Sequence, residues 1–311
     1  MSSQIDPEGL VAAVVAGDRR SLARLITVVE EGRAGSEDAL RLAHARRGDA
    51  HRIGITGAPG SGKSTLTDGL LTLLRGRNVE VGVLAVDPTS PFSGGAVLGD
   101  RVRMQDHALD TGVYIRSMAS RGHLGGLSAA APKALVVMDA AGLPVLLIET
   151  VGVGQDEVEI VSAAETVVVV LNPGWGDGIQ AAKAGILEIA DIFVVNKADR
   201  PGLREVVADI EHMLSLAGES PWVPPIVTAT AVAGEGIAEL WDAIEQHRRH
   251  LEGEGLAVRR RTRRRAELRV AVTERLRKAA AAETSRHGDL TTKVEEGEID
   301  PWTAARQIVA G

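Results

Sequence analysis

The sequence of 311 residues contains no cysteine. Disulfide bonds, a thiol nucleophile and a cysteine metal site are therefore excluded. No apolar run reaches the roughly 18 residues that a membrane-spanning helix needs. The first residues also lack the basic and apolar segments of a secretory signal. We therefore expect a cytoplasmic protein that has no membrane partner.

Aromatic residues are scarce: the chain has four Trp, two Phe and one Tyr, and its formal net charge is −7. So few aromatic rings leave little for stacking on bases, and an acidic chain does not attract a nucleic-acid backbone. Nucleic acid is therefore not an expected partner. The 44% of hydrophobic residues and the 35 glycines fit an α/β protein with a substantial core.

The most informative segment is a glycine-rich stretch that follows an apolar run and precedes a helix-like pattern. It consists of Gly57, Ala58, Pro59, Gly60, Ser61, Gly62, Lys63, Ser64 and Thr65. A strand, a glycine-rich turn and a helix N-terminus form a phosphate-binding P-loop, whose backbone N–H groups surround the phosphates. Lys63 adds a positive charge for the β- and γ-phosphates, and the Ser64 hydroxyl suits Mg²⁺. We expect a nucleotide site here.

Apolar runs alternate with helical patterns from residue 52 onward. The runs cover residues 53–56, 79–86, 113–115, 145–148, 167–171, 192–195 and 226–228, and the helical patterns cover 133–141, 179–189, 203–217 and 237–250. Continuous apolar runs indicate strands that are buried on both faces of a mostly parallel sheet. The expected fold is a doubly wound α/β domain with its ligands at the carboxyl ends of the strands.

Helical patterns flank this domain. Residues 1–50 predict an N-terminal helical extension, residues 51–250 the α/β domain, and residues 251–311 a C-terminal helical arm that serves dimerisation. Ser21 is a candidate cap for a helix in the extension, and Asp300 with Pro301 predicts the start of a helix in the arm. The arginine run at 259–265 is expected to face solvent or a partner.

The segment Asn196-Lys197-Ala198-Asp199 follows the run 192–195 and is predicted to determine which nucleotide base is bound. In an N-K-x-D motif the aspartate accepts hydrogen bonds from guanine N1–H and N2–H₂, whereas adenine presents an acceptor at N1 and is repelled. Asn196 and Lys197 are expected to brace the loop and to cover the base. The later loop that contacts the base is expected at Thr230, Ala231 and Val232. The expected nucleotide is GTP, with GDP as product.

Glu149-Thr150-Val151-Gly152 follows the run 145–148, where G proteins carry D-x-x-G. The Glu149 carboxylate is expected to reach Mg²⁺ directly or through water, and the Gly152 N–H to meet the γ-phosphate. Val153 stands where other G proteins hold a glutamine that orients the attacking water, so intrinsic hydrolysis should be slow. Gln155 is either a substitute for that glutamine or a structural residue.

Two further segments carry acidic residues toward the same edge of the sheet. Asp87 and Asp100 are either Mg²⁺ or switch residues, or turn and cap residues. In the segment 174–183, three glycines alternate with other residues, and Asp177 and Lys183 are polar candidates. Asp177 is either a helix cap or, together with Lys183, part of a mobile switch that reaches the nucleotide or a partner.

Together these motifs resemble one family. GAPGSGKST, AVDPTSPFSGGAVLGDRVRM, YIRSMASRGHLGGLS, LIETVGVGQDEVEI and NPGWGDGIQAAKAGILEIADIFVVNKADRPG are similar to the MeaB/MMAA (ArgK) G proteins over roughly residues 8–250. The resemblance implies a P-loop G domain of the SIMIBI class, with a helical extension and a dimerisation arm. It also implies Mg²⁺ at Ser64, Asp87, Asp100 and Glu149, and a third switch at Asp177 and Lys183. Candidate catalytic residues are then Lys63, Glu149, Asp177 and Lys183.

The function implied by this resemblance is that of a homodimeric, Mg²⁺-dependent GTPase. Such a protein acts as a chaperone of an adenosylcobalamin-dependent acyl-CoA mutase of the methylmalonyl-CoA mutase type, gating cofactor loading and protecting the mutase. One alternative is a metal-insertion GTPase for a nickel enzyme, which is disfavoured by the absence of cysteine and by eight scattered histidines that are expected on the surface. Another is a transport-associated ATPase or kinase, which the guanine motif disfavours.

Overall fold

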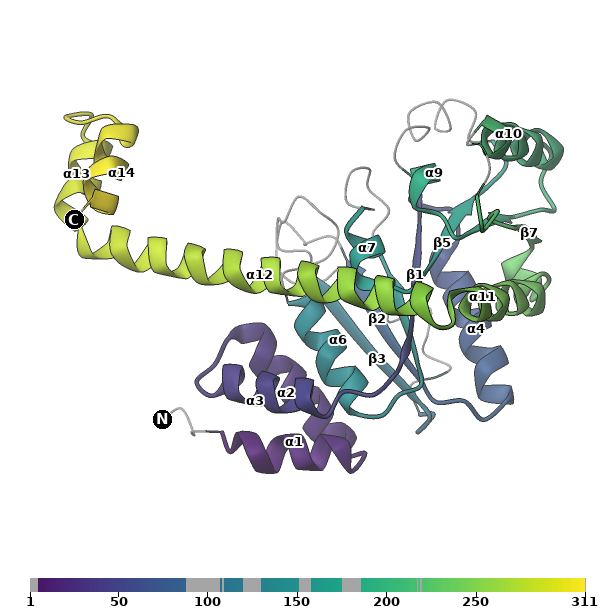
Figure 1. Ribbon diagram of the computed structural model, residues 1–311, viewed down its shortest axis with the longest axis horizontal. Coiled ribbons are helices and arrows are strands. Elements are labelled where there is room, and N and C mark those ends of the chain that lie inside the picture. The colour runs from purple at the N-terminus through teal and green to yellow at the C-terminus, as the bar shows by residue number, and fades with distance from the viewer. Residues whose placement is uncertain are drawn as a thin grey trace. The chain divides into compact units, whose positions relative to one another are not determined.

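The computed structural model describes residues 5–87, 107, 109–119, 130–150, 158–174, 186–216, 218 and 220–310 (Figure 1). Internal contacts divide the chain into two units, Met1–Arg263 and Arg264–Gly311. The first unit is built on one parallel sheet, and the second is helical in its described part. Within the described ranges, no helix is both long and apolar enough to cross a membrane.

The described residues form a sheet of seven parallel strands in the order β3-β2-β4-β1-β5-β6-β7. The strands are β1 (His51–Gly57), β2 (Val81–Asp87), β3 (Val113–Ala119), β4 (Val145–Glu149), β5 (Thr166–Leu171), β6 (Ile192–Asn196) and β7 (Ile226–Ala229). Every apolar run that predicts a strand overlaps one of them, so the doubly wound fold is confirmed. The strand order reverses at β1, which lies between β4 and β5, and in such folds ligands bind at the carboxyl end of this point.

Hydrophobic cores lie on both faces of the sheet, and alternate residues of one strand contribute to each. In β5, Val167 and Val169 belong to one core, whereas Val168 and Val170 belong to the other. This explains why the strands appear in the sequence as continuous apolar runs. One core includes α4 (Lys63–Gly76) and α11 (Ile237–Leu251); the other includes α6 (Ala131–Ala140), α7 (Val158–Ala163), α9 (Ile186–Ile189) and α10 (Leu203–Leu216).

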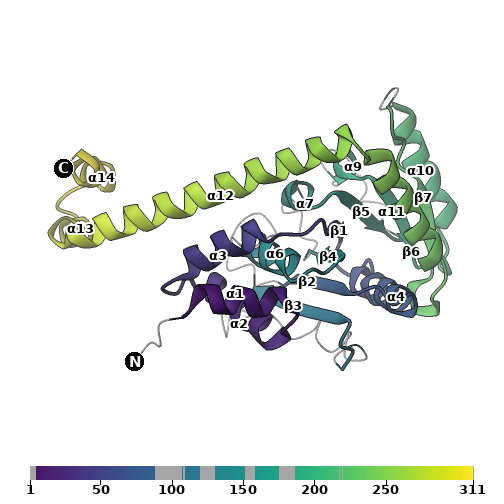
Figure 2. The same cartoon turned by 60° about the horizontal axis from the view of Figure 1, so that its bottom comes forward.

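Three N-terminal helices extend the second of these cores: α1 (Pro7–Val15), α2 (Arg19–Glu31) and α3 (Ser36–Ala45). They lie beside α6 in both views (Figures 1 and 2). Leu25 and Ile26 of α2 are fully buried. The cap of α2 is Asp18, whose carboxylate accepts a hydrogen bond from the Ser21 N–H at 2.9 Å, so the prediction of Ser21 as cap was wrong. Asp18 stands just before the first turn and reaches its free N–H groups.

The C-terminal helices begin after a two-residue turn at Glu252 and Gly253, where Gly253 has a φ of 82°. They are α12 (Glu254–Arg286), α13 (Gly288–Glu295) and α14 (Pro301–Ala310). The first turns of α12, up to Arg263, belong to the first unit. Asp300 accepts hydrogen bonds from the N–H groups of Trp302 and Thr303 at 3.1 and 3.0 Å, which confirms the predicted start of α14.

Candidate functional site

The glycine-rich turn connects the end of β1, at Gly57, to the start of α4, at Lys63. Two positions of this turn require glycine because atoms of neighbouring strands lie too close to leave room for a Cβ. A Cβ at Gly57, where φ is 138°, would lie 2.1 Å from the Val170 carbonyl oxygen. A Cβ at Gly62, where φ is 96°, would lie 2.2 Å from the Asn196 amide nitrogen. The turn is therefore packed tightly against β5 and against the last residue of β6.

The Lys63 side chain folds back over this turn. It is 6% exposed, and its ammonium donates hydrogen bonds to the carbonyl oxygens of Gly57 and Ala58 at 2.8 and 2.9 Å. An ammonium group can donate three hydrogen bonds, and its charge lies at the N-terminus of α4. The helix dipole and the lysine thus direct positive potential to the same point, as an anion site requires.

A buried group of oxygen atoms lies next to this lysine. Ser64 Oγ donates to Glu149 Oε1 at 2.5 Å, and Thr67 Oγ1 donates to Glu149 Oε2 at 3.2 Å. Glu149 is 4% exposed and is the last residue of β4. The neighbouring strand is β2, in which Ala85 pairs with Glu149 and the last residue is Asp87. Glu149 and Asp87 therefore end two adjacent strands.

This donor set fits a hard cation. Carboxylate and hydroxyl oxygens are the ligands that Mg²⁺ prefers, and Mg²⁺ in phosphate sites usually keeps water and phosphate as further ligands. Glu149 and Ser64 already lie close enough to share one ion. The predicted ligand Asp100 and the predicted phosphate contact Gly152 lie outside the described residues, as does the side chain of Asp87.

The end of β6 connects the P-loop to the loop after β7. Asn196 Nδ2 donates to the Ser61 carbonyl at 2.9 Å, and Asn196 Oδ1 accepts from the Ala231 N–H at 3.1 Å. Lys197, with a φ of 58°, donates from Nζ to the Gly60 carbonyl at 2.6 Å. The Asn196 amide therefore links two loops that are far apart in the sequence, the P-loop and the loop after β7, while Asp199 is exposed.

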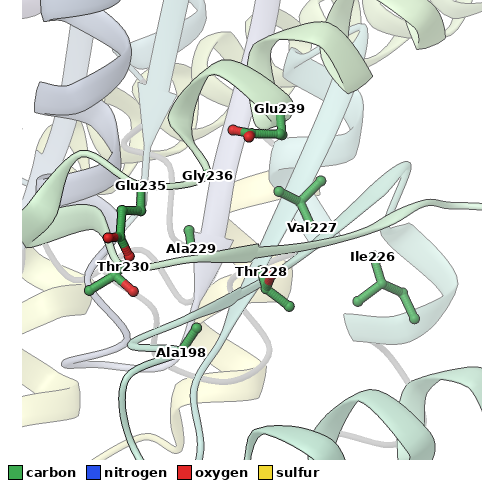
Figure 3. A pocket seen from close by; sticks show the side chains of 9 residues that line it. All are labelled: Ala198, Ile226, Val227, Thr228, Ala229, Thr230, Glu235, Gly236 and Glu239. Atoms are coloured by element: carbon green, nitrogen blue, oxygen red, sulfur yellow. The ribbon is translucent and has the colours of Figure 1, made fainter.

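The loop after β7 continues into a short 3₁₀ helix, Ala231–Ala233, that exposes 85% of Val232. Thr230 and Glu235 close this loop through two backbone hydrogen bonds, and the Ala198 N–H donates to the Ala229 carbonyl at 3.0 Å. A groove of about 440 Å³ lies beside it along β7, one of the two edge strands of the described sheet (Figure 3). Ala198 and Thr230 line the groove together with Glu239 of α11.

The predicted switch residues Asp177 and Lys183 lie outside the described residues, as do Val153 and Gln155. The described structure reaches only the entrance of that segment, residues 172–174. There the Asn172 side-chain amide donates to the Pro173 carbonyl at 3.1 Å, and Gly174 has a φ of 90°. β5 thus leads directly into the segment that is predicted to switch.

Two histidines were missed by sequence reasoning. His51 and His247 are 2% and 1% exposed, so the prediction of surface histidines was wrong for both. Their rings share the hydroxyl of Thr166, with His51 Nε2 at 2.8 Å and His247 Nδ1 at 2.9 Å. Burial, with a smaller contribution from nearby arginines, lowers the pKa of each to about 3. The only sequence signal was the position of His51 at the start of a strand.

The arginine run was also interpreted incorrectly in part. Arg263 is buried, and Arg259, Arg260 and Arg263 bond to buried carboxylates at the amino ends of the strands. Only part of the run faces solvent, because a helix turns neighbouring residues to different sides.

The fold and this arrangement define a P-loop GTPase: a strand, glycine-rich turn and helix, an acidic residue at the end of a neighbouring strand, and an Asn-Lys-x-Asp segment joined to the P-loop. The family model described as "Methylmalonyl Co-A mutase-associated GTPase MeaB" matches residues 22–285. The chain belongs to this family, which confirms the resemblance found in the sequence.

Individual relatives agree with this assignment. A protein of Pyrococcus horikoshii that is named as a GTPase is 47% identical over 305 residues, covering 96% of each chain. The mouse (Mus musculus) protein named "Methylmalonic aciduria type A homolog, mitochondrial" is 35% identical over 274 residues, covering 81% of this chain and 66% of its own length. A solved structure described as LAO/AO transport system kinase has 26% identity and a TM-score of 0.70, and the match covers 99% of each chain.

Proposed function

We propose that this GTPase uses the binding and hydrolysis of GTP to control cofactor loading on an adenosylcobalamin-dependent acyl-CoA mutase, and that it protects the mutase. The observation that carries the proposal is the match of residues 22–285 to a family described as mutase-associated GTPases. The name of the mouse relative, which refers to methylmalonic aciduria, supports the same class of partner.

Within this proposal the nucleotide is held at both ends. Residues 57–65 and the N-terminus of α4 bind the phosphates, with Lys63 beside the β- and γ-phosphates. Asp199 accepts the two guanine donors, and the loop at Thr230, Ala231 and Val232 packs against the base. The bonds from Asn196 to Ser61 and Ala231 support this assignment, because they hold the phosphate loop and the base loop in one fixed relation.

Mg²⁺ is proposed to bind at Ser64 and Glu149, with Asp87 and Asp100 as further ligands. When bound, the ion offsets negative charge on the phosphates. The Glu149 carboxylate orients the Ser64 hydroxyl by accepting its hydrogen bond, and Thr67 helps to hold that carboxylate by donating to its other oxygen. Gly152 is proposed to donate its N–H to the γ-phosphate, and Asp177 and Lys183 to transmit the nucleotide state to the partner.

The proposed assembly is a homodimer formed through the C-terminal arm. Leu268, Val272 and Leu276 recur every four residues along α12 and are 64%, 48% and 66% exposed. Residues four apart lie on one face of a helix, so they form an apolar stripe of the kind that a second helix covers. Trp302, at 81% exposure, adds a large apolar side chain to the same unit.

The test is the GTPase rate with and without a purified adenosylcobalamin-dependent mutase, together with cobalamin transfer. We expect the mutase to accelerate hydrolysis by the wild type, and GTP to control transfer. Asp177→Ala and Lys183→Ala should keep GTP affinity near normal and lose both effects. Asp209→Ala, which removes an exposed carboxylate of α10, is the matched control. Normal stimulation and normal transfer in both switch variants would refute the proposed coupling.

A transport-associated kinase is the competing assignment, because one solved relative carries that description. Asp199 opposes it, since a carboxylate facing N1 of the base favours guanine over adenine. Competition between GTP and ATP for the purified protein separates the two assignments. Preference for ATP would favour the kinase, and preference for GTP would favour the present proposal. A nickel titration tests the metal-insertion alternative in the same preparation.

A further inference from the structure

Two buried carboxylates lie at the amino edge of the sheet, at the opposite end of the strands from the P-loop. Glu165 immediately precedes β5, and Asp191 immediately precedes β6. They are 2% and 5% exposed. Buried carboxylates are costly unless they are paired, so their partners decide how firmly these strand ends are held.

Both carboxylates pair with arginines in the first turns of α12, all within the first unit, and Asp191 Oδ1 also lies 3.4 Å from His247 Nε2. Arg263 Nη1 donates to Glu165 Oε1 at 2.9 Å, and Arg260 Nε donates to the same oxygen at 3.1 Å. Arg259 Nη2 donates to Asp191 Oδ1 at 2.6 Å. Positions 259, 260 and 263 share one helix face, whereas Arg261 bonds to Glu254 on the surface.

The same carboxylates also bond to the backbone of neighbouring strands. Asp191 Oδ2 accepts from the Val167 N–H at 2.8 Å, so it joins the starts of β5 and β6. Glu165 Oε2 accepts from the Arg52 N–H at 3.3 Å, and the Glu165 N–H donates to the Arg52 carbonyl at 2.7 Å, which joins β5 to β1. The first turns of α12 are therefore fastened to three adjacent strands through two carboxylates.

Each of these strands ends at the nucleotide site. β1 enters the P-loop, β6 ends at Asn196 of the guanine motif, and β5 ends one residue before Asn172. β5 and β6 have six and five residues, and an extended strand rises about 3.3 Å per residue, so each spans less than about 20 Å. Paired strands buried on both sides transmit displacement because close-packed interiors are hardly compressible.

We propose that Arg259 and Arg263 are positioning residues of the GTPase, which act through Asp191 and Glu165. By fixing the amino ends of β5 and β6, they set the positions of the guanine loop and of residues 172–174 at the carboxyl ends. The attachment of the first turns of α12 and the affinity for guanine nucleotide are then thermodynamically coupled. Such coupling is reciprocal: the nucleotide stabilises the attachment by the same factor by which the attachment raises nucleotide affinity.

The experiment measures both directions of this coupling in the full-length protein. Arg263→Met removes the buried charge and keeps most of the side-chain volume. The matched control is Arg264→Met, which removes the next arginine in the chain, an exposed one. GDP affinity is measured by fluorescence titration, and hydrogen exchange of amides 254–263 is measured with and without GDP.

We expect GDP to slow exchange in residues 254–263 of the wild type, and Arg263→Met to weaken GDP binding by about five-fold or more, the lower end of ordinary coupling between sites. Arg264→Met should bind GDP like the wild type. Unchanged GDP affinity in folded Arg263→Met, or exchange at 254–263 that does not respond to GDP, would overturn the proposal.

A second variant covers the case in which Arg263→Met does not fold, since a single change leaves Glu165 buried with fewer partners. Arg263→Met combined with Glu165→Gln removes both charges and restores neutrality. We expect this double variant to fold and still to bind GDP about five-fold more weakly, because the fastening is gone. Wild-type GDP affinity in the folded double variant would equally overturn the proposal.

Discussion

Acid should destabilise this protein through His51 and His247, two histidines that are buried at the amino edge of the sheet. Their rings share the Thr166 hydroxyl, which has one proton and so donates to one ring while it accepts from the other. Protonation of both rings would remove the acceptor that this arrangement needs and would place two positive charges near Arg259 and Arg260.

The size of the effect follows from the lowered pKa values. Burial lowers the pKa of each histidine from 6.5 to about 3. The unfolded chain therefore binds protons that the folded protein does not, and stability present above pH 6.5 is lost as the pH falls toward 3. Between pH 7 and pH 5 each histidine should lower the free energy of unfolding by about 2 kcal/mol. The pair then costs about 4 kcal/mol, a large part of an ordinary stability of about 5–15 kcal/mol.

Asp191 acts in the opposite direction. Burial raises its pKa, against the effect of Arg259, so at acid pH the folded protein takes up this proton more readily than the unfolded chain does. The wild-type pH profile therefore combines opposing contributions. Variants of the histidines isolate their part of the profile.

The assay is urea unfolding at pH 7 and pH 5, at a fixed protein concentration and without nucleotide. His51→Gln offers an amide near the position of Nε2, and His247→Asn offers one near the position of Nδ1. Each variant should lose about 2 kcal/mol less than the wild type between the two pH values. His212→Gln, at an exposed position on α10, is the control and should follow the wild type. If the variants lose as much stability as the wild type, the two histidines are not the groups that titrate.

Three further outcomes are expected at the nucleotide site. Asp199→Asn should weaken GTP binding by about 2–4 kcal/mol and favour xanthine nucleotides, because a donor would then face guanine N1–H; undiminished GTP affinity would contradict the guanine assignment. Asn196→Ala should lower both GTP affinity and the urea midpoint, because the Ser61 carbonyl and the Ala231 N–H each lose a partner, at about 1–3 kcal/mol; a variant that matches the wild type in both titrations would show that this bridge is not needed. Val153 stands where other G proteins hold a glutamine that orients the attacking water, so the protein alone should hydrolyse GTP slowly in single-turnover assays and faster with a mutase. Fast hydrolysis by the protein alone would refute this.

The sequence predicted what depends on neighbours along the chain. Each of the seven described strands overlaps an apolar run, because strands buried on both faces carry apolar residues at most positions rather than at every second one. The start of α4 at Lys63 follows from the glycine-rich turn, and the start of α14 from Asp300 and Pro301. In each case the signal lies within a few residues of the feature that it predicts.

Side-chain partners across the sheet could not be predicted in this way. Arg263 and Glu165 are separated by 98 positions, and Arg52 and Asp139 by 87, yet both pairs are buried. A run of arginines has the same composition whether it faces water or a carboxylate, and only the contact of the first turns of α12 with the strand ends distinguishes the two cases. The guanine motif shows the same limit, because Asn196 was identified from its spacing, whereas its bonds to Ser61 and Ala231 required the fold.

Buried charged residues lie at both ends of the sheet, and each group has a distinct role. Parallel strands place their carboxyl ends at the proposed nucleotide site, where Lys63 and Glu149 are both buried. At the amino ends, backbone N–H groups at the starts of strands need acceptors, and Glu165 and Asp191 supply them. Those carboxylates then need positively charged partners. Arg259, Arg260 and Arg263, which lie about one turn apart on one face of α12, supply them. These three arginines of the run are thus explained by hydrogen-bond requirements of the sheet. They bring the start of the C-terminal helix into contact with the same strands that carry the nucleotide loops.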